Sequence, residues 1–96
     1  MSSGEINRKR VVVSGRVQGV CFRYYTQERA RQLHIRGWVR NLYSRQVEAV
    51  IEGKGSDISN MIDWMRSGPP MAHVTDITVV EEPYKAGDFV DFDVRY

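Results

Sequence analysis

Apolar residues recur with two different periods along this chain, and the period distinguishes strands from helices. Three consecutive β-branched residues, Val11, Val12 and Val13, predict a buried strand over residues 8–14. Regular alternation predicts a half-buried strand at residues 90–96, where every second side chain is apolar: Val90, Phe92, Val94 and Tyr96. Shorter runs predict three more strands, at residues 38–42, 46–52 and 74–81, with the first two joined as a hairpin.

Two segments follow the period of a helix. Residues 22–34 contain no Gly or Pro, and Gly37 marks the end of this unit; one stripe of the helix would hold Phe22, Thr26, Ala30 and Leu33. The second helix has apolar residues at i, i+3, i+4 and i+7, namely Ile58, Met61, Ile62 and Met65. We expect Ser56 to cap its start and the run Gly68-Pro69-Pro70 to end it.

The resulting order is β-α-β-β-α-β followed by one short C-terminal strand. This order predicts an α+β protein with a ferredoxin-like α/β sandwich, the split βαβ arrangement, in which two helices cover one face of an antiparallel sheet. A chain of 96 residues, of which 42% are apolar, suits one small domain. We place that domain at residues 8–96 and expect residues 1–7 to be a flexible N-terminus.

Charge and cysteine content narrow the setting. The net charge is +2, but residues 1–50 hold ten Lys and Arg against three Asp and Glu, whereas residues 51–96 hold four against nine. A basic half favours an anionic ligand, although an evenly mixed surface after folding is the alternative. One cysteine excludes an internal disulfide. With no signal peptide and no membrane-spanning run, we expect a cytoplasmic protein.

The most informative segment is the glycine-bracketed loop of residues 15–21, between the first strand and the first helix. Its backbone N–H groups and the helix N-terminus can converge on one anion. Arg23 follows in the first helical turn, where a cation is normally disfavoured unless a bound anion offsets the repulsion. The alternative is an ordinary surface arginine in a tight turn. No standard phosphate-binding motif fits the segment.

The run Gly15-Arg-Val-Gln-Gly-Val-Cys-Phe-Arg23, followed by Gly37-Trp-Val-Arg-Asn41, resembles the signature pair of the acylphosphatases. The similarity continues through Gly68-Pro69-Pro70 to the closing Phe92-Asp-Val-Arg-Tyr96, and thus covers nearly the whole domain. Two positions depart from the commoner pattern: the turn Ser44-Arg45 lacks a glycine often seen there, and His73 stands where Arg is frequent.

The resemblance implies metal-independent hydrolysis of acyl phosphates, with no cofactor. It assigns phosphate binding to Arg23 and orientation of the attacking water to Asn41. The phosphate-binding segment comprises Gly15, Arg16, Val17, Gln18, Gly19, Val20, Cys21, Phe22 and Arg23. The expected partners are the acyl phosphate and inorganic phosphate, as product and competitive inhibitor. We expect a monomer that engages neither membrane nor nucleic acid.

The chemistry agrees with this residue inventory. An acyl phosphate expels a carboxylate, whose conjugate acid has a pKa of about 4, so the leaving group needs no general acid. Phosphoryl transfer through a loose transition state demands positioning and charge stabilisation more than a strong base. An arginine, a set of loop amides and an asparagine can supply both.

The other candidate residues favour structural roles. A single residue separates Cys21 from Arg23, which does not match the loop of cysteine phosphatases, so Cys21 is interpreted as a packed or semi-exposed thiol. His34 and His73 are interpreted as structural, and Asp91 and Asp93 as a solvated strand face. The rival hypothesis is a non-catalytic anion- or nucleic-acid-binding ferredoxin-like module, but residues 46–52 lack the RNA-binding pattern of a basic residue, glycine and alternating aromatics.

Overall fold

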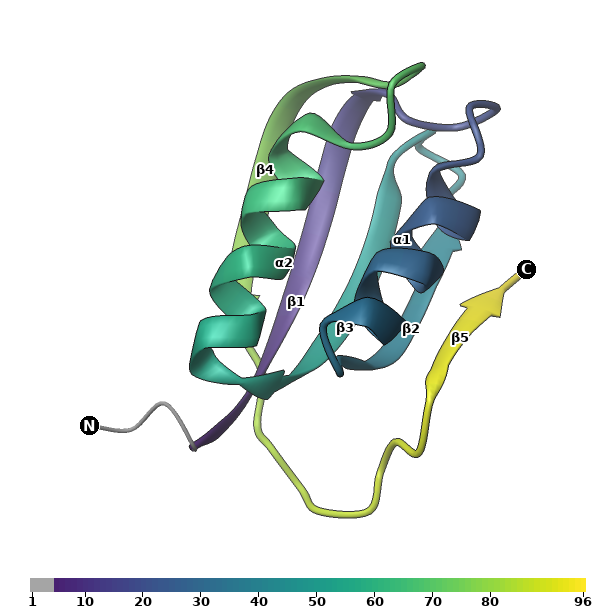
Figure 1. Ribbon diagram of the computed structural model, residues 1–96. Coiled ribbons are helices and arrows are strands. Elements are labelled where there is room, and N and C mark those ends of the chain that lie inside the picture. The colour runs from purple at the N-terminus through teal and green to yellow at the C-terminus, as the bar shows by residue number, and fades with distance from the viewer. Residues whose placement is uncertain (1–4) are drawn as a thin grey trace.

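The structure is a computed structural model that describes residues 5–96. Its elements run in the predicted order (Figure 1): β1 (Ile6–Arg16), α1 (Phe22–Gln32), β2 (Arg36–Asn41), β3 (Val47–Lys54), α2 (Gly55–Ser67), β4 (His73–Glu81) and β5 (Phe92–Arg95). The flexible N-terminus predicted for residues 1–7 falls partly on residues 1–4, which lie outside the described residues. Ile6 and Asn7 already belong to β1, because β3 extends far enough for them to pair with Lys54 and Gly53.

The five strands form one sheet in the order β4-β1-β3-β2-β5, and both helices cover the same face of it (Figure 1). The predicted ferredoxin-like α+β fold is therefore confirmed. The sheet is mixed rather than antiparallel, since β5 runs parallel to β2. The chain leaves β4 at one edge, passes across the end of the sheet, and enters the opposite edge in the direction of β2 (Figure 1).

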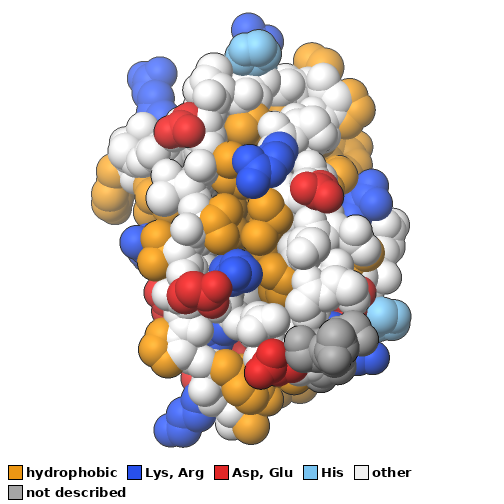
Figure 2. All heavy atoms as spheres, turned by 90° about the vertical axis from the view of Figure 1, so that its left-hand side faces the viewer, with side chains coloured by type: hydrophobic (Ala, Val, Ile, Leu, Met, Phe, Trp, Pro, Cys, Tyr) orange, Lys and Arg blue, Asp and Glu red, His pale blue; other side chains and the backbone are white. Residues whose placement is uncertain are grey.

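The core lies between the sheet and the two helices. Fully buried side chains come from both layers: Val11, Val13, Val39, Val47, Ala49 and Ile51 from the sheet, and Phe22, Ala30, Ile58, Met61 and Met65 from the helices. Burying this apolar surface is the main favourable contribution to folding in a domain of this size. The side of the molecule that carries α2 and β4 shows a band of apolar side chains among scattered charged ones (Figure 2).

Both helix boundaries correct a local prediction. Lys54, not Ser56, is the N-cap of α2, and it makes no side-chain capping bond; β3 runs directly into the helix, so Ser56 lies within the first turn. The first helix ends at Gln32, before the predicted His34. There His34 adopts φ 59° and the N–H of Ile35 donates to the carbonyl of Ala30 at 2.8 Å, which is the bond of a Schellman turn.

Gly37 consequently has a different role from the predicted helix end. It lies inside β2 with φ 139°, and a Cβ at this position would come within 1.8 Å of the carbonyl oxygen of Val50. Only glycine allows the backbones of β2 and β3 to approach so closely here. The predicted stop at Gly68 is confirmed, because that residue forms the C-cap of α2.

Candidate active site

The loop of residues 17–21 begins where β1 passes its last partner on β4. Gly15 sits at a register shift in the β1–β4 ladder with φ 115°, and a Cβ there would lie 2.2 Å from the carbonyl oxygen of His73. A side chain at this position would collide with backbone, so glycine is required for the strand to bend. Gly15 thus directs the chain out of the sheet and toward α1.

Two left-handed residues then shape the loop. Gly19 has φ 75° and Cys21 has φ 60°, and Cys21 is the N-cap of α1 without a side-chain capping bond. Within residues 5–96, no backbone–backbone hydrogen bond uses an N–H of residues 18–24 as its donor; the first helical N–H to bond is that of Tyr25, to the carbonyl of Cys21 at 3.1 Å. The first turn of α1 contains no acidic residue. This run of free donors at a helix N-terminus favours an anion.

The cleft beside this loop brings together residues that are distant in sequence. It has a volume of about 790 Å³ and is lined by Val17, Gln18, Gly19, Cys21, Phe22, Arg23, Tyr24, Gln27, Asn41, Asp93, Val94 and Tyr96. Arg23 from α1 and Asn41 from β2 therefore share one cleft. Of the predicted phosphate-binding segment, Gly15 and Arg16 do not line it; they line a neighbouring hollow together with Arg45. Val20 packs against the core instead.

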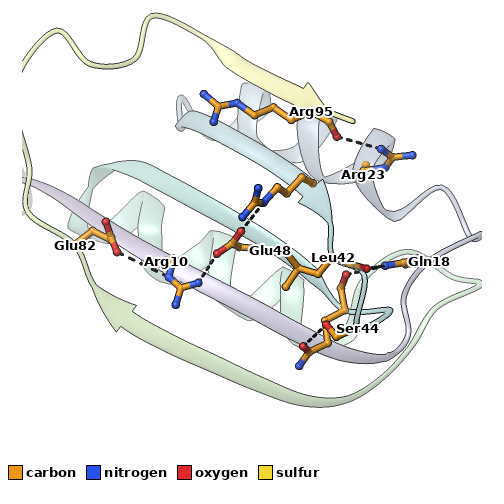
Figure 3. A network of polar contacts seen from close by, with 10 residues as sticks. Arg10, Gln18, Arg23, Leu42, Ser44, Glu48, Glu82 and Arg95 are labelled. Carbon is orange, nitrogen blue, oxygen red and sulfur yellow. Dashed lines mark hydrogen bonds and ion pairs between the residues drawn. The ribbon is translucent and has the colours of Figure 1, made fainter.

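Arg23 is the second residue of α1 and reaches toward the C-terminal end of the chain. Its Nη1 donates to the carbonyl oxygen of Arg95 at 3.1 Å (Figure 3). Its guanidinium also lies 4.7 Å from the centre of the Tyr96 ring. No carboxylate among residues 5–96 forms an ion pair with it. A guanidinium carries five N–H donors, so most of them remain available to an anion.

Asn41 is the last residue of β2, where it pairs with Val47 of β3. It is half-buried, and its side-chain amide makes no hydrogen bond within the part of the chain that the structure describes. The amide carbonyl and amino group are both free to bind a small polar molecule in the cleft. Most of α1 and of β2 separates Asn41 from Arg23 in the sequence. The two residues line the same cleft because of the position of β2 in the sheet.

Gln18 connects the loop to the hairpin that follows Asn41. Its Nε2 donates to the carbonyl oxygens of Leu42 and Gln46, each at 2.9 Å (Figure 3). Sequence reasoning included Gln18 as a member of the anion loop but gave no partner for its side chain. The turn between β2 and β3 lacks the common glycine, and here Arg45 itself takes the left-handed conformation with φ 72°.

Cys21 lies at the cleft wall and carries a free, exposed thiol, more exposed than the packed or semi-exposed thiol predicted for it. Trp38 lies on the sheet face opposite the helices, with the Arg40 and Arg95 guanidiniums 5.4 and 4.6 Å from its ring centre. Sequence reasoning missed Tyr24, Gln27 and Tyr96 as lining residues; no local pattern marks Tyr96, which reaches the cleft only through the pairing of β5 with β2.

Among the described residues, no group of three or more His, Cys, Asp or Glu side chains is placed to hold a metal ion. Within the same residues, no helix has both the length and the apolar character that crossing a bilayer requires.

Comparison with known proteins gives a consistent result. The family model described as Acylphosphatase matches residues 9–94. A curated acylphosphatase of Syntrophobacter fumaroxidans is 49% identical over 89 residues, covering 93% of this chain and 91% of the relative. An acylphosphatase structure from Coxiella burnetii superposes with a TM-score of 0.90 at 36% identity, covering 99% and 98% of the two chains. The Bacillus subtilis acylphosphatase structure superposes with a TM-score of 0.88 at 35% identity, covering 96% and 100%.

Proposed function

The chain belongs to the acylphosphatase family and has the function of an acylphosphatase, and on this premise we propose how its residues divide the reaction. The backbone N–H groups of residues 18–24 and the Arg23 guanidinium bind the phosphoryl group, and Asn41 orients the water that attacks it. The observation that carries the proposal is the single cleft in which Arg23 and Asn41 flank a loop with unused N–H donors. The reaction needs no metal ion and no cofactor.

Phosphate binding follows from the donors at the loop. The N–H groups of residues 18–24 have no backbone acceptor in the part of the chain that the structure describes, and the N-terminal end of α1 adds a partial positive charge beside them. Arg23 contributes a full charge and a planar pair of donors that matches two phosphate oxygens. Charge that spreads over the phosphoryl oxygens in the transition state is stabilised by the same groups.

Water orientation follows from the free amide of Asn41. Its carbonyl oxygen accepts a hydrogen bond from the water and holds the lone pair toward phosphorus, opposite the carboxylate leaving group. The P–O bond to the carboxylate breaks as the water oxygen bonds to phosphorus, and a phosphoryl oxygen takes the proton of the water. The products are a carboxylate and inorganic phosphate, and no general acid is needed because the carboxylate leaves as a stable anion.

The remaining parts of the proposal concern ligands and setting. We infer that inorganic phosphate, which retains the group held by the loop, competes with substrate. The cleft volume of about 790 Å³ exceeds what a phosphate fills, so an acyl group has room beside it. We also propose that the protein is a monomer and works in the cytoplasm, where the free, exposed thiol of Cys21 would stay reduced.

The test is hydrolysis of benzoyl phosphate by wild type and Asn41→Ala, with inorganic phosphate as inhibitor. Asn41→Ala is expected to lower kcat by about 10²–10³-fold while the phosphate inhibition constant stays within about 3-fold of wild type. Asn60→Ala, an exposed position on α2, is the matched control and keeps wild-type kinetics. Loss of phosphate affinity in parallel with kcat contradicts the assigned role of Asn41.

A second measurement addresses the metal. Turnover is expected to survive exhaustive chelation, because Arg23 and the loop donors supply the positive potential at the phosphoryl group. A large loss that Mg²⁺ restores would overturn this part of the proposal.

A further inference from the structure

The Gln18 side chain spans two parts of the cleft that must act together. One nitrogen, Nε2, donates to Leu42 O and to Gln46 O, both at 2.9 Å, so the two hydrogens of a single amide engage both ends of the turn that joins β2 to β3. The Leu42 N–H also donates to Gln46 O, at 2.8 Å. Figure 3 shows the amide of Gln18 directed at Leu42, the residue that follows Asn41.

Core packing of Val17 and Val20 holds the two ends of the loop, but the stretch between them is open. A Cβ added to Gly19 would meet no atom within 4 Å, so the loop backbone beside Gln18 faces solvent. In the described part of the chain, the two bonds of Gln18 are the hydrogen bonds that join residues 17–21 to the hairpin. Beside the core packing of Val17 and Val20, these two bonds therefore set the distance between the phosphate loop, residues 17–21, and Asn41.

We propose that Gln18 is a positioning residue whose side chain fixes the phosphate loop relative to Asn41, so that the bound phosphoryl group and the oriented water meet in line. This inference rests on the proposed roles of the loop and Asn41. Only a neutral amide fits the position well: a carboxylate would face two carbonyl oxygens, and an apolar side chain would donate to neither. A misplacement of about 1 Å between reacting groups can cost about 10²-fold in rate.

The experiment compares two glutamines of the same region. Gln18→Met keeps the length of the side chain but removes both donors. Gln46→Met is the matched control, because the Gln46 side chain also makes two hydrogen bonds. Its Nε2 donates to Ser14 Oγ at 2.8 Å and its Oε1 accepts from Ser44 Oγ at 2.7 Å, and neither partner belongs to residues 17–21. Its backbone carbonyl, which accepts from Gln18, is unchanged.

Gln18→Met is expected to lower kcat for benzoyl phosphate by about 10- to 100-fold, with phosphate inhibition within about 3-fold of wild type. Gln46→Met should keep kcat within about 2-fold, since its hydrogen bonds do not touch the loop. Equal losses in the two variants would mean that general loosening of the hairpin matters, and phosphate affinity falling in step with kcat would mean that Gln18 acts on the anion. Either result overturns the proposal.

A double-mutant cycle separates this inference from the proposed function. If Gln18 acts through the water held by Asn41, Gln18→Met should cost little in an Asn41→Ala background, because that alignment is already lost. If the fold-losses in kcat of the two single variants multiply in the double variant, the two residues act independently, which contradicts positioning by Gln18. If Asn41→Ala alone keeps wild-type kcat, the assigned role of Asn41 is wrong whatever the Gln18 variants do.

Gln18→Glu gives a second readout if Gln18→Met does not fold. A protonated Glu can donate to one of the two carbonyls, whereas an ionised Glu can donate to neither. The kcat of this variant relative to wild type should therefore rise as pH falls through the carboxyl pKa, whose ordinary value is about 4.3. A ratio that does not change with pH contradicts the proposed donor role.

Discussion

Two groups of arginines in this molecule have opposite electrostatic surroundings. On the sheet face opposite the helices, four arginines bind two buried carboxylates. Glu52 accepts from Arg8 at 2.8 Å and from Arg36 at 3.1 Å. Glu48 accepts from Arg40 at 2.7 Å and from Arg10 (Figure 3). Glu52 is 1% exposed and Glu48 5% exposed. Each carboxylate on β3 thus bridges arginines of β1 and β2.

At the end of the sheet with the phosphate loop, the arginines have no such partners. Arg16, Arg23 and Arg45 form no ion pair among the described residues. The basic N-terminal half of the sequence therefore contributes arginines to two different electrostatic environments. Those paired on the sheet neutralise buried carboxylates, whereas those at the loop keep their charge available to an anion.

The largest effect expected from this contrast is on Arg23. Arg23→Gln should lower kcat/KM for benzoyl phosphate by about 10³-fold or more and weaken phosphate inhibition, because the charge acts on the phosphoryl group in both ground and transition states. Arg23→Lys should rescue poorly, since a point charge lacks the planar fork. The free energy of unfolding, measured in urea, should change by less than about 1 kcal/mol.

Arg36→Gln is the matched control from the paired group. It lies on the open face and donates to Glu52, so it should leave kcat/KM within about 2-fold of wild type while lowering stability. Comparable activity losses in Arg23→Gln and Arg36→Gln would erase the distinction between the two groups.

Glu52→Gln should give the largest loss of stability. The substitution preserves size but leaves the buried Arg8 guanidinium and the partly exposed Arg36 guanidinium together around a neutral amide. Breaking a buried ion pair from one side costs about 3–5 kcal/mol. Urea unfolding measures the loss, and kcat at a temperature where the variant is folded should match wild type.

The exposed pair of Lys9 with Glu81 provides the comparison for Glu52. Glu81 is largely solvent-exposed, so Glu81→Gln should change the free energy of unfolding by less than about 1 kcal/mol. A Glu52→Gln effect no larger than that of Glu81→Gln would show that burial does not strengthen the paired group.

Glu48 should make the paired group sensitive to acid. Burial acts to raise the pKa of Glu48, but the hydrogen bonds and charges of Arg40 and Arg10 outweigh it and hold that pKa below its ordinary value of 4.5. A folded-state pKa below the unfolded one contributes stability that is present above the ordinary value and lost as pH falls through the folded pKa. The stability difference between wild type and Glu48→Gln, from urea unfolding, should therefore shrink on acidification below about pH 4.5. A difference that grows on acidification contradicts the sign.

Most of the fold could be predicted because burial in it is periodic. The apolar stripe of α2 and the β-branched run of β1 are visible in the local sequence, so the predicted order of elements is correct. Boundaries failed where a tertiary contact decides them: Ile6 joins β1 because Lys54 is its partner, and His34 closes α1 with a left-handed turn usually made by glycine. The direction of β5 also escaped prediction, because residues 82–91 contain no signal for the edge they reach.

The cleft could be predicted only in part, for a related reason. The loop and Arg23 are contiguous, so glycines next to a helix start already indicate an anion site. The assignment of Asn41 to the site required the family resemblance, because its place in the same cleft as Arg23 depends on the position of β2 in the sheet. The partners of Gln18 and the separate hollow with Arg16 and Arg45 depend on three-dimensional approach that no spacing encodes.

The smallest effect is expected from Arg16 and Arg45, which share the unpaired state of Arg23 but line the neighbouring hollow rather than the cleft. Their charges reach a substrate only through solvent, so they should steer the anion toward the loop without holding it. Arg16→Gln combined with Arg45→Gln should lower kcat/KM at low salt by about 2- to 5-fold, leave kcat unchanged, and lose its effect near 0.5 M salt, where the screening length is about 4 Å. Arg66→Gln on α2 is the control and should show no salt-dependent change. A fall in kcat in the double variant would contradict this, because it would mean that these arginines act on the reacting group. Catalysis would then require only an unpaired charge near the loop, and the cleft position of Arg23 would not be special.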